Sequence, residues 1–190
     1  MWGPQVEVLS AGFRLLVPDL PGYGDSPGPF TFDGAVGAVR ELIGSRRAHV
    51  CGLSAGAMIG LRLAARHPDV VLSLVLSGVQ VRPPRALLRL QTAAMKLIPE
   101  SKYDGVRKQT VLQAVRELSR LDLRPELTKV RSRTLVVVGA RDRLNLRAAK
   151  TAAAAIPGAQ LRVVPEAGHL WNEEQPVLFN DTLTNWLQAN

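Results

Sequence analysis

Residues 49–56 read HVCGLSAG, and this stretch decides the fold that the sequence predicts. Gly52, Ser54 and Gly56 form a G-x-S-x-G pattern, with an apolar β-like run before it and an apolar helical run, AMIGLRLAARH, after it. This context is typical of a sharp strand-to-helix turn, in which glycines allow tight packing and the serine hydroxyl lies exposed at the top of a sheet. The backbone N–H of Ala55 opens the helix and faces any oxyanion formed on an acyl group attacked by Ser54. The alternative is a turn serine whose hydroxyl bonds its own backbone.

A serine nucleophile needs a base, and the chain has three histidines. His49 begins the strand before the turn and lies more than about 10 Å from Ser54 along that strand. His67 ends the following helix, just before a proline, and is interpreted as a partner of the helix C-terminus. His169 follows the β-like run QLRVVPEA, where Gly168 lets the chain turn at the C-terminal end of a strand. Ligands of open α/β sheets bind at that edge, so His169 is the candidate base.

The candidate acid is Asp142, which ends the apolar run RTLVVVGARD at the same predicted edge. Arg141 and Arg143 flank it, so a solvated ion pair is the alternative interpretation. The order Ser54, Asp142, His169 favours a catalytic triad, because each residue lies just past an apolar strand in the sequence order of one known triad arrangement.

The motifs extend over nearly the whole chain. They include FRLLVPDLPGYGDSP (residues 13–27), VCGLSAG, VVVGARD and IPGAQLRVVPEAGHLWNEEQP (residues 156–176). With these stretches the chain resembles the serine hydrolases of the α/β-hydrolase fold, close to the enol-lactonase and small-esterase branch. The resemblance implies Ser54 as nucleophile, His169 as general base and acid, Asp142 as orienting carboxylate and Ala55 N–H as an oxyanion donor. It implies no metal or organic cofactor, and the serine argues against the branch with an aspartate nucleophile.

The sequence departs from this family at its beginning. Relatives start with two or three strands and a His-Gly loop ahead of the segment that corresponds to the first residues here, so an N-terminally truncated domain is expected. The second oxyanion donor then has no counterpart, and losing one such donor typically lowers the rate by about 100- to 1,000-fold. In the family order, the missing strand would lie between residues 13–20 and residues 48–53. These two segments must either pair directly or leave a gap, and both outcomes expose backbone groups.

Short β-like and helical runs alternate along the chain, which predicts a mostly parallel sheet with helices on both faces, within one domain over residues 1–190. The expected strands are 13–20, 49–53, 72–79, 134–139 and 160–164, and the expected helices are 32–43, 56–66, 146–155 and 175–188. A Gly- and Pro-rich loop, residues 18–29, lies at the predicted edge beside Ser54. Its Asp25 and Ser26 form either a turn or a second site, and the turn is favoured.

A helical cap insertion is expected over residues 82–133, with helical stretches at 84–98 and 105–120. Its apolar residues line a substrate pocket or pack in the core: Leu87, Leu88, Leu90, Met95, Leu97, Val111 and Leu112. This segment has 13 Lys and Arg and 5 Asp and Glu, a formal charge of +8 that equals the charge of the whole chain. The basic cap either attracts an anionic acyl substrate or presents a solvated, arginine-rich face.

Composition narrows the remaining function classes. The lone Cys51 excludes an intrachain disulfide and is interpreted as a small buried hydrophobe in a reducing compartment, so a cytoplasmic protein is expected. No run is long and apolar enough for a membrane span, and no nucleic-acid motif accompanies the basic charge. The expected partner is a small-molecule acyl substrate, with no nucleic acid and no membrane. Two functions remain open: an ester or lactone hydrolase, and a catalytically silent domain of the same fold.

Overall fold

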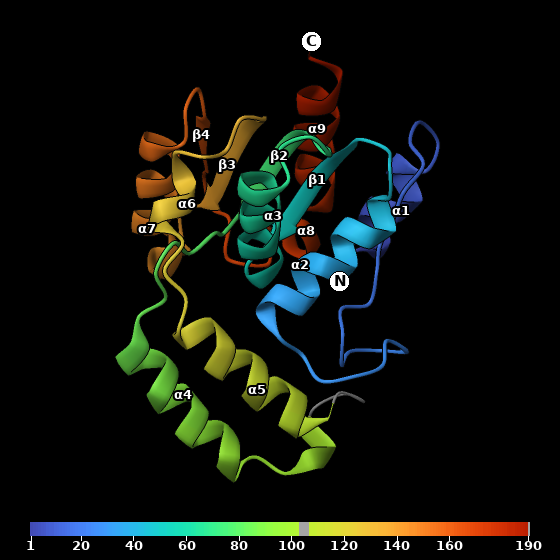
Figure 1. Cartoon of the computed structure of the whole chain (residues 1–190). Helices are drawn as coiled ribbons and strands as arrows, with labels where there is room; N and C mark the ends of the chain where they lie inside the picture. The colour runs from blue at the N-terminus through green and yellow to red at the C-terminus, as the bar shows by residue number, and fades with distance from the viewer. Residues whose placement is uncertain (103–106, 190) are drawn as a thin grey trace.

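The structure is a computed structural model that describes residues 1–102 and 107–189, apart from the side chains of Leu87 and Ser101. In the described residues a single sheet contains four parallel strands, in the order of the chain (Figure 1). They are β1 (Ala48–Leu53), β2 (Val71–Ser77), β3 (Arg133–Gly139) and β4 (Gln160–Val164). Because the strands are parallel, their C-terminal ends meet at one edge of the sheet. The prediction of a mostly parallel sheet in an α/β fold is confirmed.

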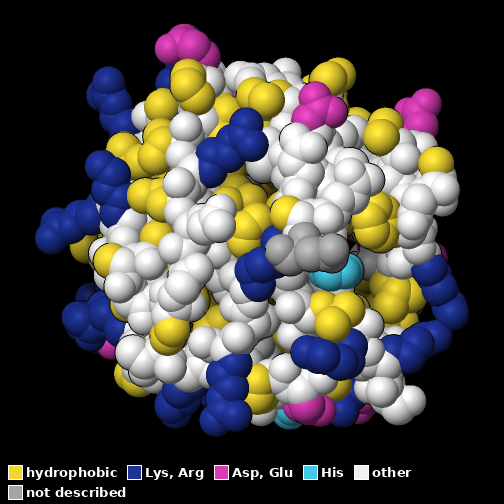
Figure 2. Space-filling model, turned by 90° about the horizontal axis from the view of Figure 1, so that it is seen from above, with side chains coloured by type: hydrophobic (Ala, Val, Ile, Leu, Met, Phe, Trp, Pro, Cys, Tyr) yellow, Lys and Arg dark blue, Asp and Glu magenta, His cyan; other side chains and the backbone are white. Residues whose placement is uncertain are grey.

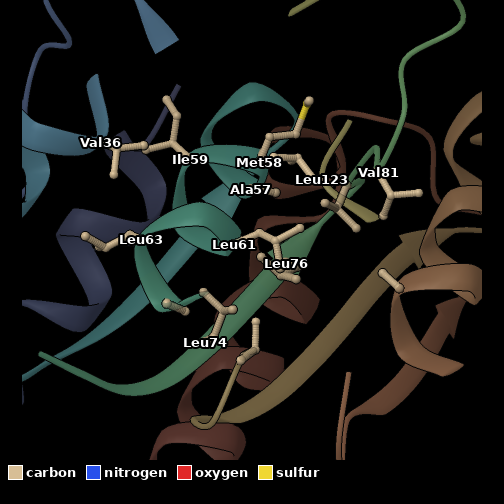
Figure 3. Packing of buried hydrophobic residues seen from close by; sticks show 14 of the residues in the cluster. Val36, Ala57, Met58, Ile59, Leu61, Leu63, Leu74, Leu76, Val81 and Leu123 are labelled. Carbon is tan, nitrogen blue, oxygen red and sulfur yellow. The ribbon is translucent and has the colours of Figure 1, made fainter. Parts of the chain in front are cut away.

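Helices cover both faces of this sheet, as predicted. Leu61 and Leu63 of α3 pack with Leu74 and Leu76 of β2 on one face (Figure 3). On the other face, α1, α8 and α9 pack on β2 and β3 through a separate cluster that contains Trp171. The described helices are α1 (Gly3–Leu9), α2 (Phe32–Ile43), α3 (Ala55–Arg66), α4 (Arg85–Leu97), α5 (Lys108–Ser119), α6 (Arg124–Leu127), α7 (Arg143–Ala155), α8 (Trp171–Glu174) and α9 (Pro176–Gln188), with a 3₁₀ turn at Glu100–Lys102.

The strand predicted at residues 13–20 is wrong. That segment is irregular, and β1 is the edge strand of the sheet. A cavity of about 430 Å³ separates residues 13–18 from β1, with α1 along its side. Of the two expected outcomes, the structure therefore has the gap. The apolar pattern at residues 13–20 did not produce a strand because a strand also requires a backbone partner at hydrogen-bonding distance.

The cap segment connects β2 to β3, and its helices α4 and α5 lie below the C-terminal ends of the strands (Figure 1). Both interpretations of its apolar residues are wrong for two positions of α4, because Leu90 is 69% and Leu97 is 86% exposed. The pocket interpretation fits α5, where Val111 lines a cavity and Ala114 is buried. Gly105 and Val106, the first residues of the second predicted stretch, lie outside the described residues, as does the side chain of Leu87.

Basic side chains are not confined to the cap. Figure 2 shows the molecule from the end opposite the cap helices, and Lys and Arg side chains lie around the rim of that face as well. Acidic side chains are few in this view. Outside residues 82–133 the chain has 11 Lys and Arg and 11 Asp and Glu, so basic side chains occur on this face while the net excess of positive charge belongs to the cap segment. None of the helices in the described ranges has the length and hydropathy needed to cross a bilayer.

Candidate active site

Ser54 lies at the turn from β1 to α3, in a conformation that is rare for a residue with a side chain. Its φ is 56°, and its N–H donates to Ser77 O at 2.8 Å. A Cβ on Gly52 would lie 2.3 Å from Gly56 O, so only glycine fits at position 52, whereas a Cβ on Gly56 would meet nothing. Within the described part of the chain, Ser54 Oγ makes no hydrogen bond, which argues against a turn serine that bonds its own backbone. Backbone strain of this kind is common at functional sites.

Asp142 follows β3 and caps the N-terminus of α7, where its side chain accepts from Asn145 N–H. Asp142 is 7% exposed, and its Oδ2 lies 2.7 Å from His169 Nδ1. The flanking Arg141 pairs with Glu166 on the surface, so the interpretation of Asp142 as a solvated ion pair is wrong. The N-cap also explains why α7 begins three residues earlier than predicted.

His169 lies beyond β4, and its approach to Asp142 depends on a glycine after β2. Gly78 has a φ of 58°, and a Cβ there would lie 3.0 Å from His169 Cε1 and 3.3 Å from Asp142 Oδ2. An L-residue at position 78 would therefore be strained and would press on both side chains. Because Nδ1 of His169 contacts the carboxylate, Nε2 is the nitrogen left to accept a proton.

Ser54, Ala55 and His169 line one cavity of about 850 Å³. Its other walls are mostly apolar and include Leu20, Val50, Ile59, Val111, Val115 and Leu118. The structure thus brings the predicted nucleophile and base to the same cavity, although no hydrogen bond joins Ser54 Oγ to His169 among the described residues. Such contacts are often long in free enzymes and shorten when substrate binds.

The other two histidines are engaged elsewhere. His49 Nδ1 contacts Ser73 Oγ at 2.8 Å, and burial, with a smaller contribution from the nearby Arg133 charge, lowers the pKa of His49 below its usual value. His67 ends α3, and its N–H donates to Leu63 O. Among the residues that the structure describes, neither has a carboxylate partner such as His169 has. In the loop with Asp25 and Ser26, Ser26 N–H donates to Tyr23 O, as in a turn.

Two residues beside the acid were not predicted from the sequence. Asn145 contacts both oxygens of Asp142, and Gln80 contacts Asn145. A polar residue three positions after a helix N-cap was the available signal for Asn145, because that position commonly contributes to capping. No pattern in the sequence indicated Gln80.

Comparisons with known proteins agree with this fold and confirm the predicted α/β-hydrolase class. A model of the alpha/beta hydrolase family matches residues 1–182, and the chain belongs to that family. An AB hydrolase superfamily protein from Gibberella zeae is 30% identical over 92% of this chain and 70% of its own length. The solved structure of an enol-lactonase from Burkholderia xenovorans matches with a TM-score of 0.89 and 26% identity, over 99% of this chain and 86% of that chain. A hydrolase from Pseudomonas aeruginosa matches with a TM-score of 0.88 and 27% identity, over 99% and 84% of the two chains. These relatives support a hydrolase.

Proposed function

We propose that the chain is a serine hydrolase that cleaves ester, lactone or related acyl bonds. The observation that carries the proposal is the strained Ser54 at the N-terminus of α3. Ser54 lies in one cavity with His169, whose Nδ1 contacts the buried Asp142 carboxylate. The likeness to an enol-lactonase structure gives the substrate class further support. The same arrangement suits any carbonyl compound that Ser54 can attack, including carbon–carbon bonds next to a carbonyl.

The proposed reaction passes through an acyl-enzyme. His169 Nε2 takes the proton of Ser54 Oγ while the oxygen attacks the carbonyl carbon, and Asp142 stabilises the imidazolium. The N–H of Ala55, the first residue of α3, donates to the oxyanion, because the first N–H groups of a helix have no intrahelical acceptor. His169 then protonates the leaving group, and a water activated by His169 hydrolyses the acyl-enzyme. No step requires a metal or an organic cofactor.

The proposed substrate is small and largely apolar around its carbonyl, because most of the cavity wall is apolar. An anionic substrate remains an alternative supported by the formal charge of +8. The kcat/KM of an anionic ester would then fall with ionic strength more steeply than that of a neutral ester. Cys51, the single cysteine, is free and partly buried, consistent with the reducing, cytoplasmic compartment that we also propose.

Labelling with a fluorophosphonate serine probe tests the proposal. We expect the parent to be labelled, and Ser54→Ala and His169→Ala to remain unlabelled. Ser26→Ala and His67→Ala serve as matched controls, because both side chains are outside the cavity lining, and they should be labelled as the parent is. A labelled parent justifies a screen of esters and lactones. A folded parent that resists labelling contradicts the proposal.

The second candidate is a catalytically silent domain of the same fold. It is favoured by the absence of a Ser54–His169 hydrogen bond in the described residues and by the single helix N–H proposed for the oxyanion. A silent domain would resist the probe and yet unfold cooperatively. The labelling experiment with a thermal melt therefore separates the two candidates.

A further inference from the structure

Asn145 contacts two residues of the proposed triad at once. Its Nδ2 lies 2.9 Å from Asp142 Oδ1, 2.8 Å from Asp142 Oδ2 and 3.1 Å from His169 Nδ1. Asn145 is 8% exposed and Asp142 is 7% exposed, so little water competes for these contacts. An ionised carboxylate only accepts hydrogen bonds, which means that the amide must present its NH₂ group, not its oxygen, to Asp142.

Gln80 fixes that orientation of the Asn145 amide. Its Nε2 donates to Asn145 Oδ1 at 2.7 Å and to Leu144 O at 2.8 Å. An amide turned by 180° would place its oxygen against the Asp142 carboxylate and its NH₂ against the Gln80 NH₂, so both contacts would become repulsive. Gln80 follows β2 at the start of the connection to the cap, whereas Asn145 belongs to α7. The two side chains thus link separate parts of the fold at the acid.

We propose that Asn145 is a positioning residue, oriented by Gln80, that holds the Asp142 carboxylate against His169 Nδ1. A carboxylate on one χ2 bond rotates readily unless a second donor fixes it, because that torsion is broad. The backbone N–H of Asn145 donates to Oδ1 at 3.4 Å, and the Asn145 NH₂, at 2.9 and 2.8 Å, supplies the closer donor to both oxygens. The Nδ1–H of His169 is then kept on Asp142 Oδ2, and Nε2 stays free to take the proton of Ser54. This inference rests on the proposed function, and it adds two residues that do not touch the substrate.

The test compares Asn145→Leu, which keeps the size and removes the donor, with the matched control Asn180→Leu. Asn180 is a buried amide of α9 that donates to Pro4 O, away from the triad. We expect the rate of fluorophosphonate labelling to fall about tenfold in Asn145→Leu, which corresponds to the loss of one hydrogen bond to a charged group. In Asn180→Leu the rate should change by less than about twofold. With an ester substrate the loss should fall on kcat, with little change in KM.

Proton NMR gives a readout that does not need activity. A hydrogen bond to a buried carboxylate shifts the Nδ1 proton of His169 to low field and slows its exchange with water. We expect this resonance in the parent and in Asn180→Leu, and its broadening or loss in Asn145→Leu. If the parent is not labelled, the proposed function fails while the resonance still decides the place of Asn145.

A pair of variants at Gln80 covers the case in which Asn145→Leu does not fold. Gln80→Glu replaces the donor by an acceptor that favours the turned amide, whereas Gln80→Met only removes the donor. We expect a larger loss of labelling and of the low-field resonance in Gln80→Glu than in Gln80→Met. Equal losses in the two, or an unchanged resonance in Asn145→Leu, would overturn the proposal.

Discussion

Asp142→Asn exchanges the buried carboxylate for an amide of the same shape. The carboxylate accepts from His169 Nδ1 at 2.7 Å and from Asn145 Nδ2 at 2.8 and 2.9 Å, and an amide offers one oxygen in place of two. If that oxygen faces Asn145, the new NH₂ faces His169 Nδ1, and the ring proton must move to Nε2. A ring protonated at Nε2 cannot take the proton of Ser54. If the amide turns the other way, two NH₂ groups oppose each other.

The expected loss follows from these contacts. The reactive tautomer loses one charge-assisted hydrogen bond, worth about 1.5–3 kcal/mol, and faces an unpaired buried donor, which costs about 1–3 kcal/mol. A combined effect of about 4 kcal/mol lowers the labelling rate about 10³-fold. The assay is pseudo-first-order fluorophosphonate labelling at pH 8, with Asp25→Asn in an exposed loop as the control and a thermal melt of each variant. A decrease of less than tenfold in a folded Asp142→Asn would refute the assignment of Asp142.

Three further predictions concern the supports of the site. Gly78→Ala places a Cβ 3.0 Å from His169 Cε1 at a φ of 58°, so labelling should fall at least about tenfold while Tm falls by about 2–8 °C, measured on the same sample. Arg62→Leu removes the contacts of a buried guanidinium of α3 with Glu126 and Asp33. Urea unfolding should show that the free energy of unfolding falls by only about 2 kcal/mol, because Arg66 still reaches both carboxylates. Adding Glu126→Leu should restore part of that free energy, because it removes a buried carboxylate that has lost its partner. Desolvation raises the pKa of the Cys51 thiol from near 9 to about 12, so the free energy of unfolding should fall as pH rises from about 9 to 12. Cys51 is partly buried and lines both cavities, so its protection comes from the scarcity of thiolate, and iodoacetamide at pH 8.5 should react much more slowly with the folded than with the unfolded protein. Equal alkylation rates of the folded and unfolded protein would contradict this.

Much of the candidate site was predictable because its residues follow apolar runs. Ser54, Asp142 and His169 each lie just past a strand, and parallel strands bring such positions to one edge of a sheet. The position of each histidine in its predicted element could distinguish His169 from the other two, since one of those begins a strand and the other ends a helix. What the sequence did not contain was the contact distance between elements, so the Asn145 and Gln80 amides were missed.

The N-terminal part of the fold was predicted less well, for a physical reason. Residues 13–20 have the apolar character of a strand, but apolar character specifies burial and does not supply a ladder partner. The short helices α1 and α8 were also missed, because seven and four residues are too few for a helical period to be read. Their packing against α9 and β3 stabilises them instead, as the cluster around Trp171 shows.

The end of β2 contributes to the site more than any motif indicates. Ser77 O accepts from Ser54 N–H and so helps to hold the strained turn, while Ser77 Oγ accepts from Trp171 Nε1 at 2.9 Å. The next residue, Gly78, donates its N–H to Val137 O and leaves the space that His169 and Asp142 occupy. Because β1 is an edge strand of the described sheet, its neighbouring strand at Ser54 is β2. Ser77, the last residue of β2, and Gly78, which follows it, therefore link the proposed nucleophile to the proposed base and acid. Substitutions at these two positions should impair the reaction without removing any reacting group.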